Sequence, residues 1–179
     1  EKINLMSQST FSLINKDFTT ILKTILDVEI MPFKDLKIKS IFLHNSLTDI
    51  LVALELFNVL QIFDDHMKNK YKIIPGYCTL NFFSLSNFLK KNNYQKPTIM
   101  APFNSIGFQM NPSKSQNENI LKNSDANIIA MNTLASGFIK PKEAYKYISQ
   151  FSEIKSFIIG SSSKRHIFET FAEINKNIF

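Results

Sequence analysis

The stretch IKSFIIGSSSKRHIFETFAEI, residues 154–174, contains an apolar run, a small polar turn and an amphipathic segment. The run IKSFIIG (154–160) is apolar without strict alternation, as expected for a strand covered on both faces. The segment after the turn has apolar side chains at helical spacing, which predicts a helix that buries Ile167, Phe168, Phe171 and Ile174. The stretch therefore predicts one strand, one turn and one helix, the unit from which parallel sheets are built.

The same unit recurs along the chain. Five further apolar runs precede polar turns, namely KINLM (2–6), IKSIFLH (38–44), YKIIPGY (71–77), PTIMAPF (97–103) and NIIAM (127–131). Their starts lie 26 to 36 residues apart, close to the roughly 30 residues per unit of a (β/α)8 barrel. The 179 residues are therefore expected to form a single α/β domain, a TIM-type barrel with about six βα units in this chain.

Six strands alone leave two open sheet edges and an uncovered interior. We expect the first two units to lie upstream of this chain. A partner that supplies them, or a sheet that opens into a doubly wound arrangement, are the alternatives.

Three helices are expected between the runs. The first spans Ser46 to Phe63 and begins with Ser46 or Thr48 as its cap. Ser84 caps the second, and Pro141 occupies the first turn of the third. Their inward side chains are expected to be Leu47, Ile50, Leu51, Leu54 and Phe57, then Leu85, Phe88 and Leu89, then Ala144, Tyr147, Ile148 and Phe151. The polar stretch 111–125 is expected to form a solvated loop and a short helix.

Composition excludes several classes of protein. Hydrophobic residues make up 44% and charged residues 20% of the chain, and no apolar stretch is long enough for a membrane span. The net charge of +6 comes from dispersed lysines, so no nucleic-acid footprint is predicted. Cys78 is the only cysteine, which rules out an internal disulfide or a Cys-based zinc site. A cytoplasmic protein with a small-molecule substrate is expected, while its oligomeric state is left open.

The turn after the last strand is suited to an anion. Gly160 lets backbone approach a ligand, and Ser161, Ser162 and Ser163 offer hydroxyls and amides at the positive end of a helix. Lys164 and Arg165 oppose that helix dipole, which a bound phosphate would compensate. An ordinary serine cap followed by solvated cations is the alternative, and spacing alone does not separate the two.

Three other residues are candidates for catalysis or metal binding. His44 ends an apolar strand, where an imidazole can act as a proton donor or an electrophile near neutral pH, or can serve a structural role. Cys78 lacks a nearby base and is expected to pack rather than react. His66 follows a helix in a charged turn and is expected to be solvated rather than to bind metal. No P-loop and no Rossmann fingerprint occurs.

The order of these motifs resembles the aldo-keto reductase superfamily, TIM-barrel carbonyl reductases that use NADP or NAD. The segments that carry the resemblance are IFLHNSLTD, PGYCTLNFFSLSNFL, TIMAPFN, IIAMNTLASG and IIGSSSKRHIFET. The resemblance implies that His44 is the active-site histidine. It implies that Cys78 and Thr79 lie at the nicotinamide carboxamide and that Asn132, Leu134 and Gly137 lie along the pyrophosphate. It further implies Ser161, Ser162 and His166 around the adenosine phosphate and Glu169 beside the adenine. The other residues expected to bind the cofactor are Asn104, at a strand end, and Gly160 and Ser163, in the turn suited to an anion.

Several positions depart from the family pattern. The catalytic Asp and Tyr of the family belong to early units that this sequence lacks, and Ser7 or Gln8 stands where the lysine is expected. Met100, Thr79 and Met131 replace a glutamine, an asparagine and an aromatic residue. The expected function is an oxidoreductase of aldo-keto reductase type acting on a small carbonyl or alcohol. The alternatives are a reductase-dead binding or regulatory module, and a nicotinamide-independent lyase, isomerase or hydrolase that uses His44 on a phosphorylated metabolite.

Overall fold

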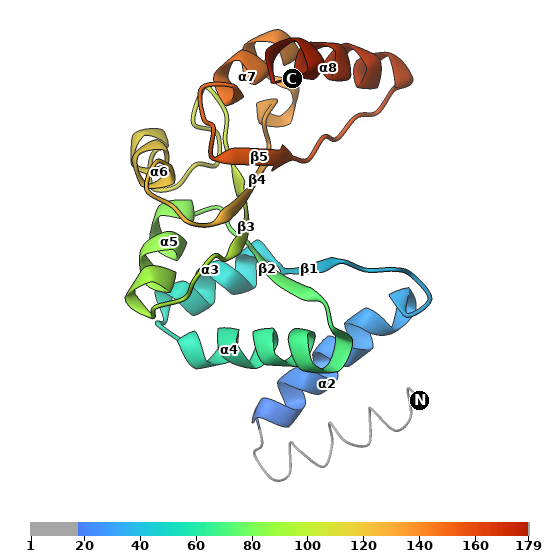
Figure 1. Ribbon diagram of the computed structural model, residues 1–179, viewed down its shortest axis with the longest axis vertical. Helices are drawn as coiled ribbons and strands as arrows, with labels where there is room; N and C mark the ends of the chain where they lie inside the picture. Colours follow the sequence, from blue (N-terminus) through green and yellow to red (C-terminus); the bar gives the residue numbers. More distant parts are fainter. Residues whose placement is uncertain (1–17, 179) are drawn as a thin grey trace. The chain divides into compact units, whose positions relative to one another are not determined.

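The computed structural model describes residues 18–178 of the chain. They form an α/β fold of five strands and seven α-helices, which follow one another along the chain in Figure 1. The elements are α2 (Phe18–Ile30), β1 (Ser40–Leu43), α3 (Asn45–Ala53), α4 (Phe57–His66), β2 (Ile74–Cys78), α5 (Phe82–Lys91), β3 (Thr98–Pro102), α6 (Lys114–Leu121), β4 (Asn127–Met131), α7 (Pro141–Ile148), β5 (Ile154–Phe157) and α8 (Lys164–Asn177), with short helical turns η1 (Met31–Phe33), η2 (Met67–Tyr71) and η3 (Ala135–Gly137).

The chain divides into two compact units. Among the described residues, unit 1 contains 18–41 and 56–75, and unit 2 contains 42–55 and 76–178. The three boundaries fall inside β1, between α3 and α4, and inside β2. The single domain expected over residues 1–179 stays a prediction.

The strands form an all-parallel sheet in the order β1-β2-β3-β4-β5. Five of the six predicted strands are thereby confirmed, whereas the predicted strand at 2–6, with Ser7 and Gln8 at its end, lies outside the described residues. Register pairs Cys78 with Met100 and Pro102 with Met131. Each βα connection leads to the adjacent strand, always toward the same edge of the sheet. Because such connections are right-handed, they place the connecting helices on one face of the sheet. This order is compatible with part of a TIM-type barrel.

The two faces of the sheet in unit 2 differ in burial. One face is fully covered and carries Tyr77, Ile99, Ala101, Ile128 and Ala130. The opposite face carries Cys78, Met100, Ile129 and Met131, which are all partly exposed. Phe42 also lies on this less buried face, because its ring covers Gly76, two residues before Cys78. The covered face is the one that the helices pack against.

Two predicted helices of unit 2 are confirmed with their inward faces. In α5, Leu85, Phe88 and Leu89 are buried. In α7, which begins at Pro141, Ala144, Tyr147 and Ile148 are buried, and Phe151, three residues after the helix ends, is buried as well. The cap of α5 is Asn81 rather than Ser84, because the Asn81 side chain accepts a hydrogen bond from the Ser84 N–H. The polar stretch 111–125 contains the short helix α6, as expected.

The predicted helix from Ser46 to Phe63 is wrong. It is broken into α3 and α4 at Glu55, whose φ of 55° is left-handed. The cap is His44 rather than Ser46 or Thr48. Of the predicted inward side chains, Leu47, Ile50 and Leu54 are more than half exposed. The helix instead buries Thr48, whose hydroxyl donates to the Leu43 carbonyl.

The predicted inward face of the last helix is also largely wrong. In α8, Ile174 is buried as expected, but the other buried residue is Thr170, while Ile167, Phe168 and Phe171 are exposed. Ile174 joins a cluster in which α8 packs on α7 through Ala144 and Tyr145. Apolar spacing gave the helix but not the side on which it packs.

Unit 1 is built around α2 and α4. Leu60, Phe63 and Met67 form its buried centre. His66, expected to be solvated, is 9% exposed and lies 2.6 Å from the carboxylate of Asp27 in α2. That correction has a physical cause, since a carboxylate 39 residues earlier in the chain compensates burial of the ring. Within the described range, no helix has the length and apolarity to cross a membrane.

Candidate functional site

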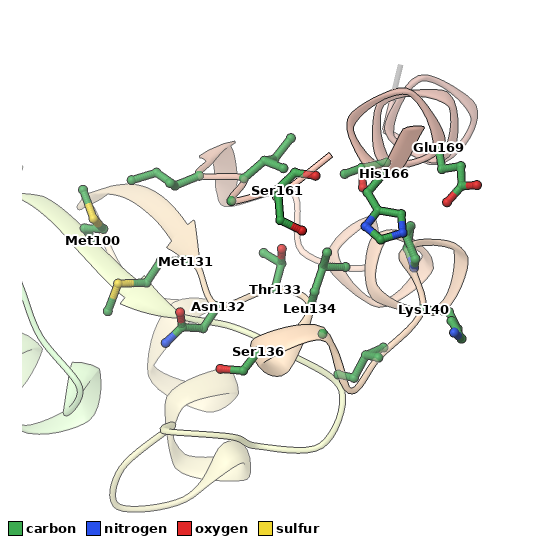
Figure 2. Close-up of a pocket in the computed structure, with 18 residues that line it drawn as sticks. Met100, Met131, Asn132, Thr133, Leu134, Ser136, Lys140, Ser161, His166 and Glu169 are labelled. Atoms are coloured by element: carbon green, nitrogen blue, oxygen red, sulfur yellow. The ribbon is translucent and has the colours of Figure 1, made fainter. Parts of the chain in front are cut away.

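A cavity of about 630 Å³ lies at the carboxyl ends of β3, β4 and β5 in unit 2. Figure 2 shows Met100 and Met131 at one end, and Lys140, His166 and Glu169 at the other. The structure brings together around this cavity eight residues predicted for a cofactor, namely Asn132, Leu134, Gly137, Gly160, Ser161, Ser162, His166 and Glu169. They meet because parallel strands end at the same edge of a sheet.

The turn after β4 forms one wall of the cavity. Asn132, Ala135 and Ser136 have φ values of 51°, 45° and 56°, in the left-handed region that side chains other than glycine seldom adopt. The amide N–H groups of Ala135 and Gly137 are taken by carbonyls within the turn. The Asn132 amide donates to the Gln109 side chain. Backbone held in this way is characteristic of ligand sites.

The turn after β5 forms the opposite wall. Ser163 caps α8 by accepting the His166 N–H, and the Ser161 hydroxyl donates to the Ser163 carbonyl at 3.0 Å. Ser163 therefore supports the turn and does not line the cavity, although it was predicted to contact a cofactor. A Cβ built on Gly160 would meet nothing within 4 Å, so the fold itself does not require glycine there.

The α8 end of the cavity is lined by polar and charged side chains. Lys140 and His166 line it together with Glu169. The Glu169 carboxylate accepts a hydrogen bond from Arg165 at 2.7 Å, which lowers the pKa of Glu169, and the charges of His166 and Lys140 lower it further. Arg165 thus has a carboxylate partner, whereas we expected a phosphate to compensate it. Lys140 is the cation that the sequence analysis missed, although it directly precedes the Pro141 that begins α7.

The other end of the cavity is apolar. Met100 and Met131 line it, and the Cys78 thiol lies 3.7 Å from the Met131 sulfur without lining the cavity itself. Burial raises the pKa of Cys78, a bond involving the Asn45 backbone partly offsets this, and the Asp49 charge adds to it. The thiol is therefore protonated at neutral pH, in line with a packing role.

Two other predicted cofactor residues are occupied elsewhere. Thr79 is fully buried, and its hydroxyl donates to Asp49 while accepting the Asn81 N–H. Asn104 is also fully buried, and its amide closes a loop through two hydrogen bonds with the backbone of Phe108, at 2.7 and 2.8 Å. Neither lines the cavity. Both side chains hold the turns that follow their strands.

His44 lies at the carboxyl end of β1, the same edge of the sheet, and is exposed. Its Nδ1 accepts the Ser46 N–H at 3.3 Å and so caps α3. A neutral ring with Nδ1 as acceptor carries its proton on Nε2. The imidazole therefore combines a structural role with a donor N–H that faces away from its own helix cap.

Comparison of the sequence with profiles of known protein families and with characterised proteins finds no match. Within the part of the chain that the structure describes, no group of three or more His, Cys, Asp and Glu side chains is arranged to hold a metal ion.

Proposed function

We propose that this chain is part of an aldo-keto-reductase-like barrel that binds NADP or NAD in the cavity at the ends of β3 to β5, and that it oxidises or reduces a small alcohol or carbonyl compound. One observation carries the proposal: eight residues predicted for a cofactor, from two segments separated in sequence, line a single cavity. The consecutive, all-parallel strand order with one less buried face supports the barrel.

The chemistry of the lining fits an extended dinucleotide. Lys140 supplies a cation and His166 an imidazole at one end, beside the hydroxyls of Ser161 and Ser162. Phosphates are bound by this combination of charge and hydrogen-bond donors. The opposite end, at Met100 and Met131, offers an apolar surface for a flat ring. The volume of about 630 Å³ is within the range of ligand sites.

The chain's own contribution to the reaction would be stabilisation of the developing alkoxide. A reduced nicotinamide supplies a hydride to a carbonyl carbon when it is bound. The His44 hydrogen bond to Ser46 leaves Nε2–H as the donor of a neutral ring, which is suited to hydrogen-bond the carbonyl oxygen as an electrophile. The proton that completes the alcohol would come from solvent.

A second candidate, a barrel that binds the nucleotide without turnover, is favoured by a specific observation. Thr79, which the resemblance assigns to the nicotinamide end, is buried and donates to Asp49, and Asn104, another expected cofactor residue, is buried and hydrogen-bonded to the backbone of Phe108. Thioether side chains at Met100 and Met131 make no strong hydrogen bonds. The adenosine end of the proposed site is therefore better equipped than the nicotinamide end.

Isothermal titration of NADPH and NADH into the full chain tests the binding step. Lys140→Glu places a negative charge beside the proposed phosphates, and we expect it to raise Kd about tenfold or more, which is roughly 1.4 kcal/mol. Lys142→Glu is the matched control, because Lys142 is exposed, lies two residues away and does not line the cavity. Absence of binding by both nucleotides would refute the proposal.

Turnover separates the candidates. With a panel of aldehydes and ketones, the oxidoreductase consumes NADPH, and His44→Ala lowers kcat without changing the Kd for NADPH. Nucleotide binding without consumption across the panel would favour the binding module. Absence of nucleotide binding, combined with His44-dependent conversion of phosphorylated metabolites, would favour the nicotinamide-independent enzyme.

A further inference from the structure

Unit 1 contains a second cavity that the proposed function does not use. It has a volume of about 570 Å³ and lies beside the end of α2, η1 and the segments that precede β1 and β2. All of its lining residues belong to unit 1, and they are Asp27, Ile30, Met31, Phe33, Lys34, Leu36, Lys37, Ile38, Lys70, Tyr71 and Ile73. We call it the unit 1 cavity.

One wall of the unit 1 cavity is a buried polar cluster. The Asp27 side chain is 10% exposed and accepts hydrogen bonds from His66 Nε2 at 2.6 Å, Lys70 Nζ at 2.6 Å and the Tyr71 hydroxyl at 2.5 Å. The Tyr71 ring packs edge-on against His66, with 5.7 Å between centroids. These bonds fix the orientation of Lys70 and Tyr71 at the cavity wall.

The charge of Asp27 is already compensated within this cluster. Burial acts to raise its pKa, but the hydrogen bonds from Lys70, Tyr71 and His66 outweigh burial, and the pKa of Asp27 is lowered. The carboxylate therefore stays ionised and paired. A cationic ligand would have to compete with three existing donors for it.

The rest of the lining combines apolar side chains with cations. Ile30, Ile38 and Ile73 belong to the apolar part of the wall. Lys34 and Lys37 are both exposed, and among the residues that the structure describes neither forms an ion pair with a carboxylate. The lining thus carries three lysines against one compensated carboxylate. That pattern matches a ligand with an apolar body and a negative group.

We propose that the unit 1 cavity binds a small organic carboxylate, with its apolar part against the isoleucines and its carboxylate toward Lys34 and Lys37. This site is separate from the cavity at the ends of β3 to β5, which we call the nucleotide cavity, because the two share no lining residue.

Three probes with the same eight-carbon body test the proposal on the full chain: octanoate, 1-octanol and octylamine. We expect octanoate to bind about tenfold more tightly than octanol, because only octanoate gains charge-assisted hydrogen bonds. Octylamine should bind more weakly than octanol. Isoleucine methyl spectra should show octanoate-dependent shifts at Ile30, Ile38 and Ile73, and no change at Ile158, which lines the nucleotide cavity.

Variants of exposed lysines test the charge requirement without disturbing the buried cluster. Lys34→Gln combined with Lys37→Gln should weaken octanoate about tenfold and leave octanol unchanged. Lys39→Gln is the matched control, because Lys39 is exposed in the same segment but does not line the cavity. Equal binding of all three probes, shifts centred outside the unit 1 cavity, or octanoate affinity that is insensitive to the double substitution would each overturn the proposal.

Discussion

Removal of the Asp27 carboxylate should destabilise unit 1 more than any change to one of its partners. In Asp27→Ala, three hydrogen bonds to a side chain that is 10% exposed are lost. The bond from Lys70, whose side chain is 51% exposed, is expected to contribute at most about 1 kcal/mol. The bonds from buried His66 and from Tyr71 to a charged acceptor contribute roughly 1.5 kcal/mol each. The expected loss is therefore about 3 to 4 kcal/mol.

Two milder substitutions provide the comparison. Asp27→Asn retains an oxygen for the bonds at Oδ1, where His66 and Tyr71 both donate, but turns an amide toward the Lys70 ammonium. We expect it to cost about 1 to 2 kcal/mol. Lys70→Gln should cost about 1 kcal/mol or less. Hydrogen exchange of α2 and α4 peptides, followed by mass spectrometry, measures these losses within unit 1 itself.

The pH dependence gives an independent check with a defined sign. The pKa of Asp27 in the folded protein lies below its ordinary value of 3.8. The bonds to the Asp27 carboxylate therefore stabilise the fold above pH 3.8, and this stabilisation is lost as the pH falls toward the folded pKa. The difference in stability between the native protein and Asp27→Asn should therefore shrink as the pH falls below about 4. If Asp27→Ala costs no more than Lys70→Gln, or if this difference does not change on acidification, the reasoning about this cluster is refuted.

Two further predictions concern packing in unit 2. Gly76→Ala should lower the free energy of unfolding in urea by about 1 to 3 kcal/mol, because the new Cβ would lie 2.5 Å from the Phe42 ring. Gly160→Ala, whose Cβ would meet nothing within 4 Å, should cost under about 0.5 kcal/mol. Equal costs would contradict the close packing at Gly76. Tyr147→Phe should cost about 1 kcal/mol by removing the 2.7 Å bond to Glu118. Burial, and to a lesser extent Glu118, raise the pKa of Tyr147. The native protein should therefore lose stability above about pH 10 more steeply than Tyr147→Phe. Parallel pH profiles of the two proteins would argue against a buried neutral phenol.

The strands could be predicted from the sequence because each is a short apolar run bounded by turns. The buried faces of the helices are harder to predict from the sequence. Leu47 and Ile50 in α3, and Leu54 directly after it, have inward spacing and yet are exposed. Periodicity indicates which side chains share a stripe, but the partner that covers the stripe is not encoded locally. Pro141 worked as a helix start because its restricted φ acts within one residue.

The candidate site also contains residues that could be predicted from the sequence and residues that could not. Residues such as Asn132 and Ser161 meet at one cavity because strand direction alone brings their turns to the same edge. Thr79 and Asn104 were misjudged as cavity residues because short polar side chains bond first to the nearest turn or carboxylate. The pairing of His66 with Asp27 joins segments far apart in sequence, and no local pattern indicates it.

The most direct test of the nucleotide cavity is a hydrogen-exchange footprint of the full chain with and without saturating NADPH. The proposal predicts slower exchange at residues 132–137 and 158–166, which form the two walls of the cavity, and no change at α2 or α4 in unit 1. Slower exchange confined to other segments, or an unchanged pattern at concentrations that saturate known reductases, would contradict it.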